Sequence, residues 1–486
     1  MSHYFDLFRK NIIGNDLLFP SPYGMKKMIY ADWIASGRLY MPIEKNFLET
    51  IGPFVGNTHT ETSEVGKLMT QAYHLSHQKI KAHVNAGKED VIITTGFGMT
   101  GAVVKFQRIL GLKSCCEESH PHFSDESEKP VIFVTHMEHH SNQTTWYETN
   151  ADVVVIEPGK DMLVDLNHLE SALKKYALRQ KKIGAFTACS NVTGIRTPYH
   201  AMAQLMHEYG GLAFIDFAAS APYDDMNMHP AKPMEKLDAI FFSPHKFLGG
   251  PGASGVLIFD SGLYKMKVPD QPGGGTVDWT NPWGEYKYID NIEIREDGGT
   301  PGFLQAIRTA LAIELKNRMD VKMIHPREKE LTGIAFREFR KIPNLHLLAD
   351  AVEDRLGVMS FYMPGIHYNL IVGLLSDRFG IQVRGGCACA GTYGHFLLDV
   401  SYEKSKVITD KINLGDLSEK PGWVRVSLHP TMTDEEVIFM ADALKQIEKH
   451  HKEWGQDYTY NMHTNEFQHK SGIPGKQKID SWFTLD

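Results

Sequence analysis

Short runs of β-branched and aromatic residues alternate with amphipathic segments between residues 90 and 260. Most of these runs are apolar at consecutive positions, which is typical of strands that helices cover on both faces. Strands that alternate with helices in this way predict a mostly parallel α/β sheet. The seven predicted strands are Val91–Thr94, Val131–Thr135, Val153–Glu157, Gly184–Ala188, Leu212–Asp216, Ala239–Ser243 and Gly255–Phe259.

Two of the intervening segments have the end signals of α-helices. Asp165 is a good N-cap for the segment LNHLESALKKYA, which follows it directly. The next helix begins at Pro198 and ends at Gly210, in line with the preference for proline at the start and glycine just past the end. Both helices therefore fit as connections between parallel strands.

The pattern changes after about Pro301, where a long helix, PGFLQAIRTALAIELKNRM, leads into a region with fewer strands. A chain of 486 residues is too long for one ordinary hydrophobic core, so two domains are expected. We expect residues 1–30 to join the smaller domain, 31–310 to form a large α/β domain, 311–455 a small α+β domain and 456–486 a polar, aperiodic tail. The strands expected in the smaller domain are Gly357–Tyr362, Gly380–Val383 and Trp423–Leu428, and its helices Tyr368–Phe379 and Asp434–Lys449.

Charge and cysteine usage exclude several classes of function. The formal net charge of −8 indicates no basic surface for nucleic acid or an anionic membrane. No run approaches the roughly 18 apolar residues of a membrane span, and the N-terminus lacks the pattern of a signal peptide. Five cysteines are too sparse for a disulfide framework, so a reduced, cytoplasmic location is expected. The polar segment Lys113–Lys129 is predicted to be an exposed loop.

The segment FFSPHKFLGGPG, residues 241–252, carries the strongest chemical signal. An apolar strand ends at Ser243, and Lys246 follows in a glycine-rich turn. Ligands of open α/β sheets bind beyond the carboxyl ends of the strands, so a site is expected at this lysine. Lys246 could form a Schiff base there while Ser243 and His245 bind a phosphate. A solvated lysine in a surface loop is the alternative, and it becomes less favoured once the other motifs are added.

Two further strands end in ionisable side chains. Asp216 closes the strand in GLAFIDFAASAP, where a carboxylate could pair with a protonated pyridine nitrogen, or act as an N-cap or metal ligand. His139 and His140 follow the strand in PVIFVTHM, and an imidazole there could stack on a planar ring and move protons. The spacing of His136, His139 and His140 matches no standard zinc site, so no metal is expected.

Three motifs give weaker signals. Gly98, Met99 and Thr100 lie between a strand and a helix, where backbone N–H groups and a hydroxyl could bind an anion, or where the chain simply turns. Asn191, in ACSNVTG, could donate to a ring hydroxyl or a substrate carboxylate, although turn chemistry also explains it. Arg425, in the apolar strand WVRVSL, could hold a substrate carboxylate in bidentate geometry or form a structural salt bridge.

Two cysteines lie on a glycine-rich loop. Cys387 and Cys389, in VRGGCACAG, follow a predicted strand, and such a loop is accessible in the way that a nucleophilic thiolate requires. The alternatives are buried small residues or half of a metal pair. No second pair of matching spacing exists in the chain, so zinc is only weakly supported.

In this order, the segments YAD at residues 30–32, MEHHSN, SNVTG, FSPHKFLGGPG and GGTP resemble the class V aminotransferase superfamily of fold type I pyridoxal-phosphate enzymes. Within it, the chain looks most like the cysteine desulfurases and selenocysteine lyases. The matching segments extend from Tyr30 to Arg425. The resemblance implies a type I α/β fold, pyridoxal 5′-phosphate as cofactor, an amino acid substrate, a homodimer and a sulfur-acceptor protein as a possible partner.

The resemblance also implies a role for each candidate residue. Lys246 would bind the cofactor covalently and move the substrate's Cα proton, and Asp216 would pair with the pyridine nitrogen. Arg425 would hold the substrate carboxylate, Asn191 would lie near the ring and the substrate, and Cys389 would accept sulfur as a persulfide. The residues expected around the ring and phosphate are His139, Gly98, Met99, Thr100, Ser243, His245 and, reaching a neighbouring subunit, Thr300 in DGGTPG.

Three places depart from the desulfurase pattern. Ala219 occupies a position where the desulfurases usually carry glutamine, and Cys387 and Ala388 lie where histidine is common. The motif at the helix start is Gly98-Met99-Thr100, whereas the desulfurases usually have a pair of threonines together with a glutamate there. The favoured function is a cysteine desulfurase-like reaction that yields L-alanine and an enzyme persulfide. Transamination, epimerisation or elimination on another amino acid is the enzymatic alternative. A non-catalytic scaffold that binds a partner is the alternative of another class.

Overall fold

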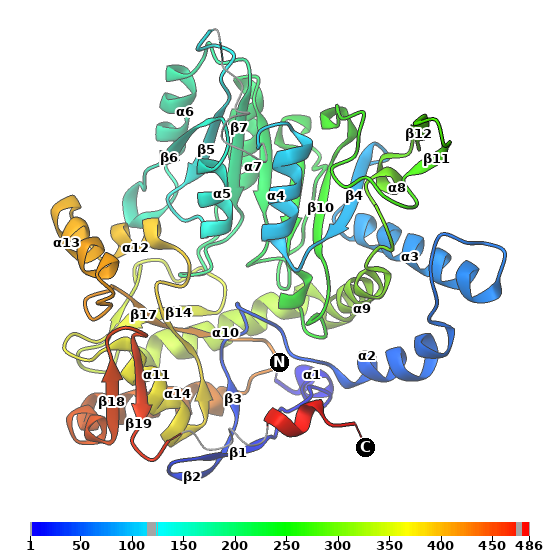
Figure 1. Ribbon diagram of the computed structural model, residues 1–486. Helices are drawn as coiled ribbons and strands as arrows, with labels where there is room; N and C mark the ends of the chain where they lie inside the picture. The colour runs from blue at the N-terminus through cyan, green and yellow to red at the C-terminus, as the bar shows by residue number, and fades with distance from the viewer. Residues whose placement is uncertain (1, 114–122, 124, 473–478, 486) are drawn as a thin grey trace. The chain divides into compact units, whose positions relative to one another are not determined.

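A computed structural model of the chain describes residues 2–113, 123, 125–472 and 479–485 (Figure 1). Most of the predicted loop Lys113–Lys129 lies outside the described residues. The chain forms two compact units, each with its own internal contacts. The larger unit comprises Ala35–Ser190 and Arg196–Lys322, and the smaller unit comprises Met1–Ile34, Asn191–Ile195 and Met323–Asp486. The finer domain scheme, with a separate tail, stays a prediction.

A seven-stranded sheet forms the centre of the larger unit. Its strand order is β4-β10-β9-β8-β7-β5-β6. Only β10 runs antiparallel to its neighbours, and the other pairs are parallel, which confirms the predicted mostly parallel α/β sheet. The strands are β4 (Asp90–Thr95), β5 (Val131–Thr135), β6 (Asp152–Ile156), β7 (Lys182–Thr187), β8 (Leu212–Asp216), β9 (Ala239–Phe242) and β10 (Gly255–Asp260).

The register of the sheet brings the carboxyl ends of the parallel strands to one edge. Thr187, the last residue of β7, pairs with Asp216, the last residue of β8. Asp216 in turn pairs with Phe241 of β9. Loops that leave these strands therefore begin side by side, at the edge where open α/β sheets bind ligands.

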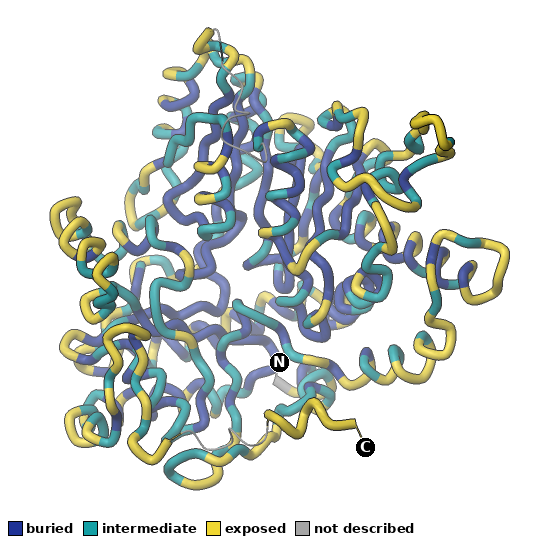
Figure 2. Tube along the Cα trace, viewed as in Figure 1, coloured by how far each residue is buried: buried dark blue, intermediate teal, exposed yellow. Residues whose placement is uncertain are grey.

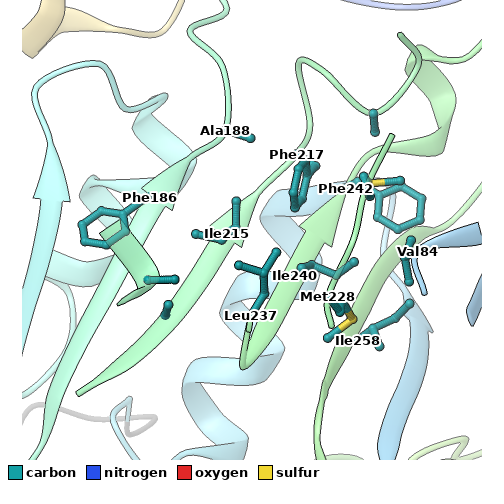
Figure 3. Close-up of a cluster of buried hydrophobic side chains, with 14 of the residues drawn as sticks. Val84, Phe186, Ala188, Ile215, Phe217, Met228, Leu237, Ile240, Phe242 and Ile258 are labelled. Carbon is teal, nitrogen blue, oxygen red and sulfur yellow. The ribbon is translucent and has the colours of Figure 1, made fainter. Parts of the chain in front are cut away.

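Hydrophobic clusters cover both faces of this sheet. Side chains alternate along a strand, so Phe214 and Ile215 of β8 belong to different clusters. Figure 3 shows Ile215, Ile240 and Phe217 in one of them, and every residue of β5, β7 and β9 is buried (Figure 2).

The helices of this unit are α2 (Met41–Lys45), α3 (Glu64–His83), α4 (Met99–Ile109), α5 (Thr144–Tyr147), α6 (Leu166–Lys175), α7 (Tyr199–Glu208), α8 (Ile292–Arg295) and α9 (Phe303–Met319), with a hairpin of β11 (Val277–Thr280) and β12 (Tyr286–Tyr288).

An antiparallel sheet of order β13-β14-β17-β16 forms the centre of the smaller unit. The N-terminal segment belongs to the same unit. Its strand β3 pairs in parallel with β15, and the guanidinium of Arg9 binds the Glu436 carboxylate at 2.6 Å. The strands are β1 (Leu18–Ser21), β2 (Gly24–Lys27), β3 (Ile29–Tyr30), β13 (His346–Leu347), β14 (Val358–Tyr362), β15 (Ile381–Gln382), β16 (Arg384–Gly386) and β17 (Trp423–Ser427). The helices are α1 (Ser2–Arg9), α10 (Val321–Phe339), α11 (Tyr368–Phe379), α12 (Gly391–Leu397), α13 (Tyr402–Asn413) and α14 (Asp434–Trp454).

Two predictions for this unit need correction. The strand expected at Gly380–Val383 is shorter, since only Ile381–Gln382 pair with β3, and a separate strand, Arg384–Gly386, follows it and pairs with β17. The segment after Trp454, expected to be aperiodic, contains a hairpin of β18 (Tyr458–Asn461) and β19 (Glu466–His469). Within the described residues, no helix has the length and apolar composition that would let it cross a bilayer.

Removal of a ring from the sheet's core tests this packing. Phe214 is fully buried, and its ring centroid lies 5.1 Å from that of Phe106 on α4. We expect Phe214→Ala to lower the free energy of unfolding by about 3–5 kcal/mol, because the cavity cannot fully collapse. Urea denaturation measures the change, with Leu178→Ala as the control, since Leu178 is 88% exposed. Equal effects of the two substitutions would contradict the packing described.

Candidate active site

The lysine of the SPHK turn lies directly beyond β9, in the larger unit. Pro244–Lys246 form a single 3₁₀ turn after the buried Ser243. The Ser243 hydroxyl accepts a hydrogen bond from the Met99 N–H at 2.8 Å, at the start of α4. The His245 Nδ1 lies 3.0 Å from the Phe97 carbonyl oxygen. These two bonds hold the lysine turn close to the start of α4. A phosphate site formed by both segments needs them to lie this close together.

Glycine is needed at position 98 for close packing of these two loops. A Cβ atom added to Gly98 would lie 3.0 Å from both the Ser243 Oγ and the His245 Cε1. The adjoining Thr100 is exposed, and its hydroxyl lies 2.6 Å from that of Ser141. The structure therefore brings together Gly98, Met99, Ser243 and His245, and places Thr100 beside the segment that follows His139.

His139 begins a short turn after β5. Its Nδ1 accepts a hydrogen bond from the Ser141 N–H at 3.1 Å, so the proton of the neutral imidazole sits on Nε2. His136, by contrast, is buried, and its ring nitrogens lie within 3.3 Å of the carbonyl oxygens of Ile156 and Met162. Among the described residues, no three His, Cys, Asp or Glu side chains gather as metal ligands would.

Glu138 is a buried residue that the sequence reasoning missed. Its carboxylate accepts hydrogen bonds from the backbone N–H groups of Thr135 and Thr187, at 3.1 and 2.9 Å, and from the Asn142 side chain at 2.8 Å. It thereby joins the ends of β5 and β7 and holds the His139 segment. Burial raises the pKa of Glu138 to about 8, although hydrogen bonds from the Thr135 hydroxyl, the Asn142 side chain and the Thr187 N–H lower it. The signal that could have revealed it is a glutamate between an apolar strand and a histidine pair.

Asp216 is a carboxylate removed from water at the end of β8. It is 3% exposed, and its Oδ1 accepts a hydrogen bond from the Ala218 N–H at 2.8 Å. Burial raises the pKa of Asp216 to about 6, although the Ala218 N–H and the positive charge of Lys246 act in the opposite direction. A carboxylate in this environment is stabilised as an anion by a further cationic partner. The geometry therefore suits a ligand that carries a positive charge between these strand ends.

A second group of candidate residues lies in the smaller unit, around Arg425 of β17. This arginine is 3% exposed. Its Nη2 binds the Asp32 carboxylate at 2.9 Å, and its Nη1 donates to the Asn191 carbonyl oxygen at 3.2 Å. The structural salt bridge considered for Arg425 is thus present. Burial lowers the pKa of Arg425, whereas the charge of Asp32 raises it.

Arg425 and Asn191 both retain hydrogen-bonding capacity. The Asn191 Nδ2 donates to the Ala388 carbonyl oxygen at 2.8 Å, which ties this residue to the cysteine loop. Within the described part of the chain, the Asn191 Oδ1 and the Arg425 Nε are buried without a hydrogen-bond partner. An unsatisfied buried donor and acceptor are unfavourable, so both atoms fit a polar ligand such as an amino acid.

The two cysteines of interest lie on the loop between β16 and α12. Cys389 is exposed and Cys387 is half-buried, and neither forms a disulfide. Cys389 has a φ of 56°, a left-handed conformation that is uncommon for residues other than glycine. By contrast, Cys189 is buried. Thr300 is exposed on a different loop of the larger unit, where its hydroxyl donates to the Asn57 side chain at 3.2 Å.

The sequence model of the class-V aminotransferases matches residues 29–439. The chain belongs to the aminotransferase class-V family. Similar curated proteins include a probable cysteine desulfurase from Staphylococcus epidermidis, 28% identical over 394 residues, and one from Staphylococcus aureus at 26% identity. Both alignments cover 80% of this chain and 89% of the relative.

Solved structures show that this class-V chain shares the fold of the cysteine desulfurases. The apo cysteine desulfurase from Thermococcus onnurineus superposes with a TM-score of 0.72 at 22% identity, over 91% of this chain and 98% of that one. The desulfurase CsdA from Escherichia coli gives 0.69 at 20% identity, over 92% and 98%. The predicted type I α/β fold is confirmed.

Asp216→Asn in ligand-free protein tests the burial of this carboxylate. The folded-state pKa of about 6 lies above the ordinary 3.8, so the folded protein binds more protons than the unfolded chain between these values. The free energy of unfolding of the wild type should therefore fall, relative to the variant, by about 1 kcal/mol as the pH rises from about 5 to about 7. Urea denaturation at both pH values measures this difference. An identical pH dependence for both proteins would contradict the desolvated setting of Asp216.

Proposed function

We propose that this enzyme uses pyridoxal 5′-phosphate to convert L-cysteine into L-alanine and carries the released sulfur as a persulfide on Cys389. The observation that carries the proposal is the placement of the buried Asp216 at the end of β8 and of Lys246 in the turn after the adjacent strand β9, in a chain of the class-V family. The relatives' names, probable cysteine desulfurase, support the choice of reaction.

The residues of the larger unit fit this cofactor. Lys246 would hold it covalently through its amine, and Asp216 would pair with the protonated ring nitrogen, which would place a positive charge directly beside this buried carboxylate. His139 would lie against the face of the ring. The residues proposed for the phosphate are Gly98, Met99, Thr100, Ser243 and His245, with Thr300 from a neighbouring subunit of a homodimer.

When bound, pyridoxal phosphate acts as a sink for the electron pair of the substrate's Cα–H bond. The Lys246 amine takes the proton from Cα, and the negative charge of Asp216 keeps the ring nitrogen protonated. In the smaller unit, the Arg425 guanidinium and the Asn191 amide bind the substrate carboxylate. The unpartnered Nε of Arg425 is a free donor for that carboxylate, whereas the unpartnered Oδ1 of Asn191 can accept a hydrogen bond from a donor group of the substrate.

The sulfur step requires a thiolate on Cys389. The thiolate forms a bond to the sulfur of cysteine, and the Cβ–S bond of the substrate breaks. Its electron pair remains with Cβ, which takes a proton, so that the products are alanine and a Cys389 persulfide. Exposure of Cys389 on its loop supports this role, because a nucleophile must reach the substrate.

A reaction at Cα of another amino acid is the second candidate. The observation that favours it is Ala219, a buried residue without a hydrogen-bonding side chain at the position where the desulfurases carry glutamine. The presence of both Lys246 and Asp216 argues against a non-catalytic scaffold.

We further propose that the protein lies in the cytoplasm and that a second protein accepts the sulfur.

Incubation with L-cysteine tests the proposed reaction. The wild type should release alanine and, with a reductant, sulfide in equal amounts. Cys389→Ser should lower both by about a hundredfold or more, because no thiolate accepts the sulfur, and should keep the cofactor's visible absorbance. Lys246→Ala should lose both the turnover and that absorbance. Desulfuration by Cys389→Ser at the wild-type rate, or amino transfer to a keto acid without sulfide, would contradict the proposal.

A further inference from the structure

A cavity of about 770 Å³ lies beside the cysteine loop, wholly within the smaller unit. Its volume is in the range of small-molecule sites. Most of its lining residues come from three segments that are distant in sequence: helix α11, the cysteine loop, and the C-terminal hairpin β18–β19. Among the lining residues are Tyr368, Asn369, Cys387, Cys389, Phe467 and His469.

The hairpin is a fixed wall of this cavity. The Asn369 side chain donates to the Asn465 carbonyl oxygen at 2.5 Å, and the Asn465 side chain donates to the Tyr368 hydroxyl at 2.6 Å. The Tyr460 hydroxyl in turn donates to the Asn465 Oδ1 at 2.9 Å. The hairpin lies beyond residue 439, where the match to the family ends. This wall of the cavity therefore lies outside the part of the chain that matches the family.

The two thiols of the loop line the same cavity but differ in exposure. Cys389 is exposed, whereas Cys387 is half-buried. One residue, Ala388, separates the cysteines, so their Cα atoms are at most about 7 Å apart. The loop thus places two thiols close together in the wall of one cavity.

We propose that Cys387 is a second sulfur-carrying residue, which takes the sulfur from Cys389 and presents it to an acceptor in this cavity. The inference rests on the proposed desulfurase function. The Cys387 thiolate forms a bond to the outer sulfur of the Cys389 persulfide, and the bond between the two persulfide sulfurs breaks. Cys389 leaves as a thiolate, and Cys387 becomes the persulfide. Electrons balance without an added oxidant or reductant, as in ordinary thiol exchange.

The experiment follows the sulfur on the holoenzyme after one turnover. Enzyme is mixed with one equivalent of L-cysteine, quenched with an alkylating agent at increasing times, and digested for mass spectrometry. In the wild type the sulfur should appear first on Cys389 and then on Cys387. The peptide with the buried Cys189 is the internal control and should stay unmodified.

Two variants separate the relay from the desulfuration itself. Cys387→Ser should still form one alanine per site and keep the sulfur on Cys389, whereas transfer of sulfur to dithiothreitol should fall about tenfold. Cys389→Ser should carry sulfur on neither cysteine. Sulfur that never reaches Cys387 in the wild type, or a disulfide between the two cysteines with release of sulfide, would overturn the relay but leave the desulfurase proposal intact. Absence of alanine in the wild type would overturn both.

Discussion

A carboxylate removed from water must either take up a proton or lie beside a positive charge, and Asp216 is under this constraint. It closes a buried strand, and one backbone N–H group donates to it. Its pKa is raised despite the positive charge of Lys246 in the next strand's turn. The fold therefore positions a negative charge that a protonated ring nitrogen would stabilise, and most of the proposed chemistry follows from this arrangement.

The rest of the larger unit supports that arrangement. Parallel pairing brings the ends of β7, β8 and β9 to one edge, so the loops after them start side by side. The buried Glu138 links β5 to β7 and fixes the segment that carries His139. Hydrogen bonds between the SPHK turn and residues Phe97 and Met99, at the start of α4, hold Lys246 beside the proposed phosphate site. The sheet and these hydrogen bonds thus position the side chains of the proposed site.

The seven strands of the large sheet were predictable because each is a short, nearly continuous apolar run with turn residues at its ends. Lys246 and Asp216 were predictable because they follow such runs directly. Glu138 was not, because its importance depends on donors from β7, some fifty residues away in the sequence. The hairpin β18–β19 was missed because only a few aromatic residues alternate there among polar ones, and the contacts that fix it come from α11. The short β15 within Gly380–Val383 and the separate β16 after it likewise depend on partner strands that sequence patterns do not show.

The most direct test of the account is to locate the cofactor on the chain. Enzyme with bound pyridoxal phosphate is reduced with borohydride, which makes the link between the cofactor's aldehyde and a lysine amine permanent, and the digested peptides are analysed by mass spectrometry. The account predicts a phosphopyridoxyl group on Lys246 alone. A group on another lysine, or none on an enzyme that nevertheless turns over cysteine, would contradict it.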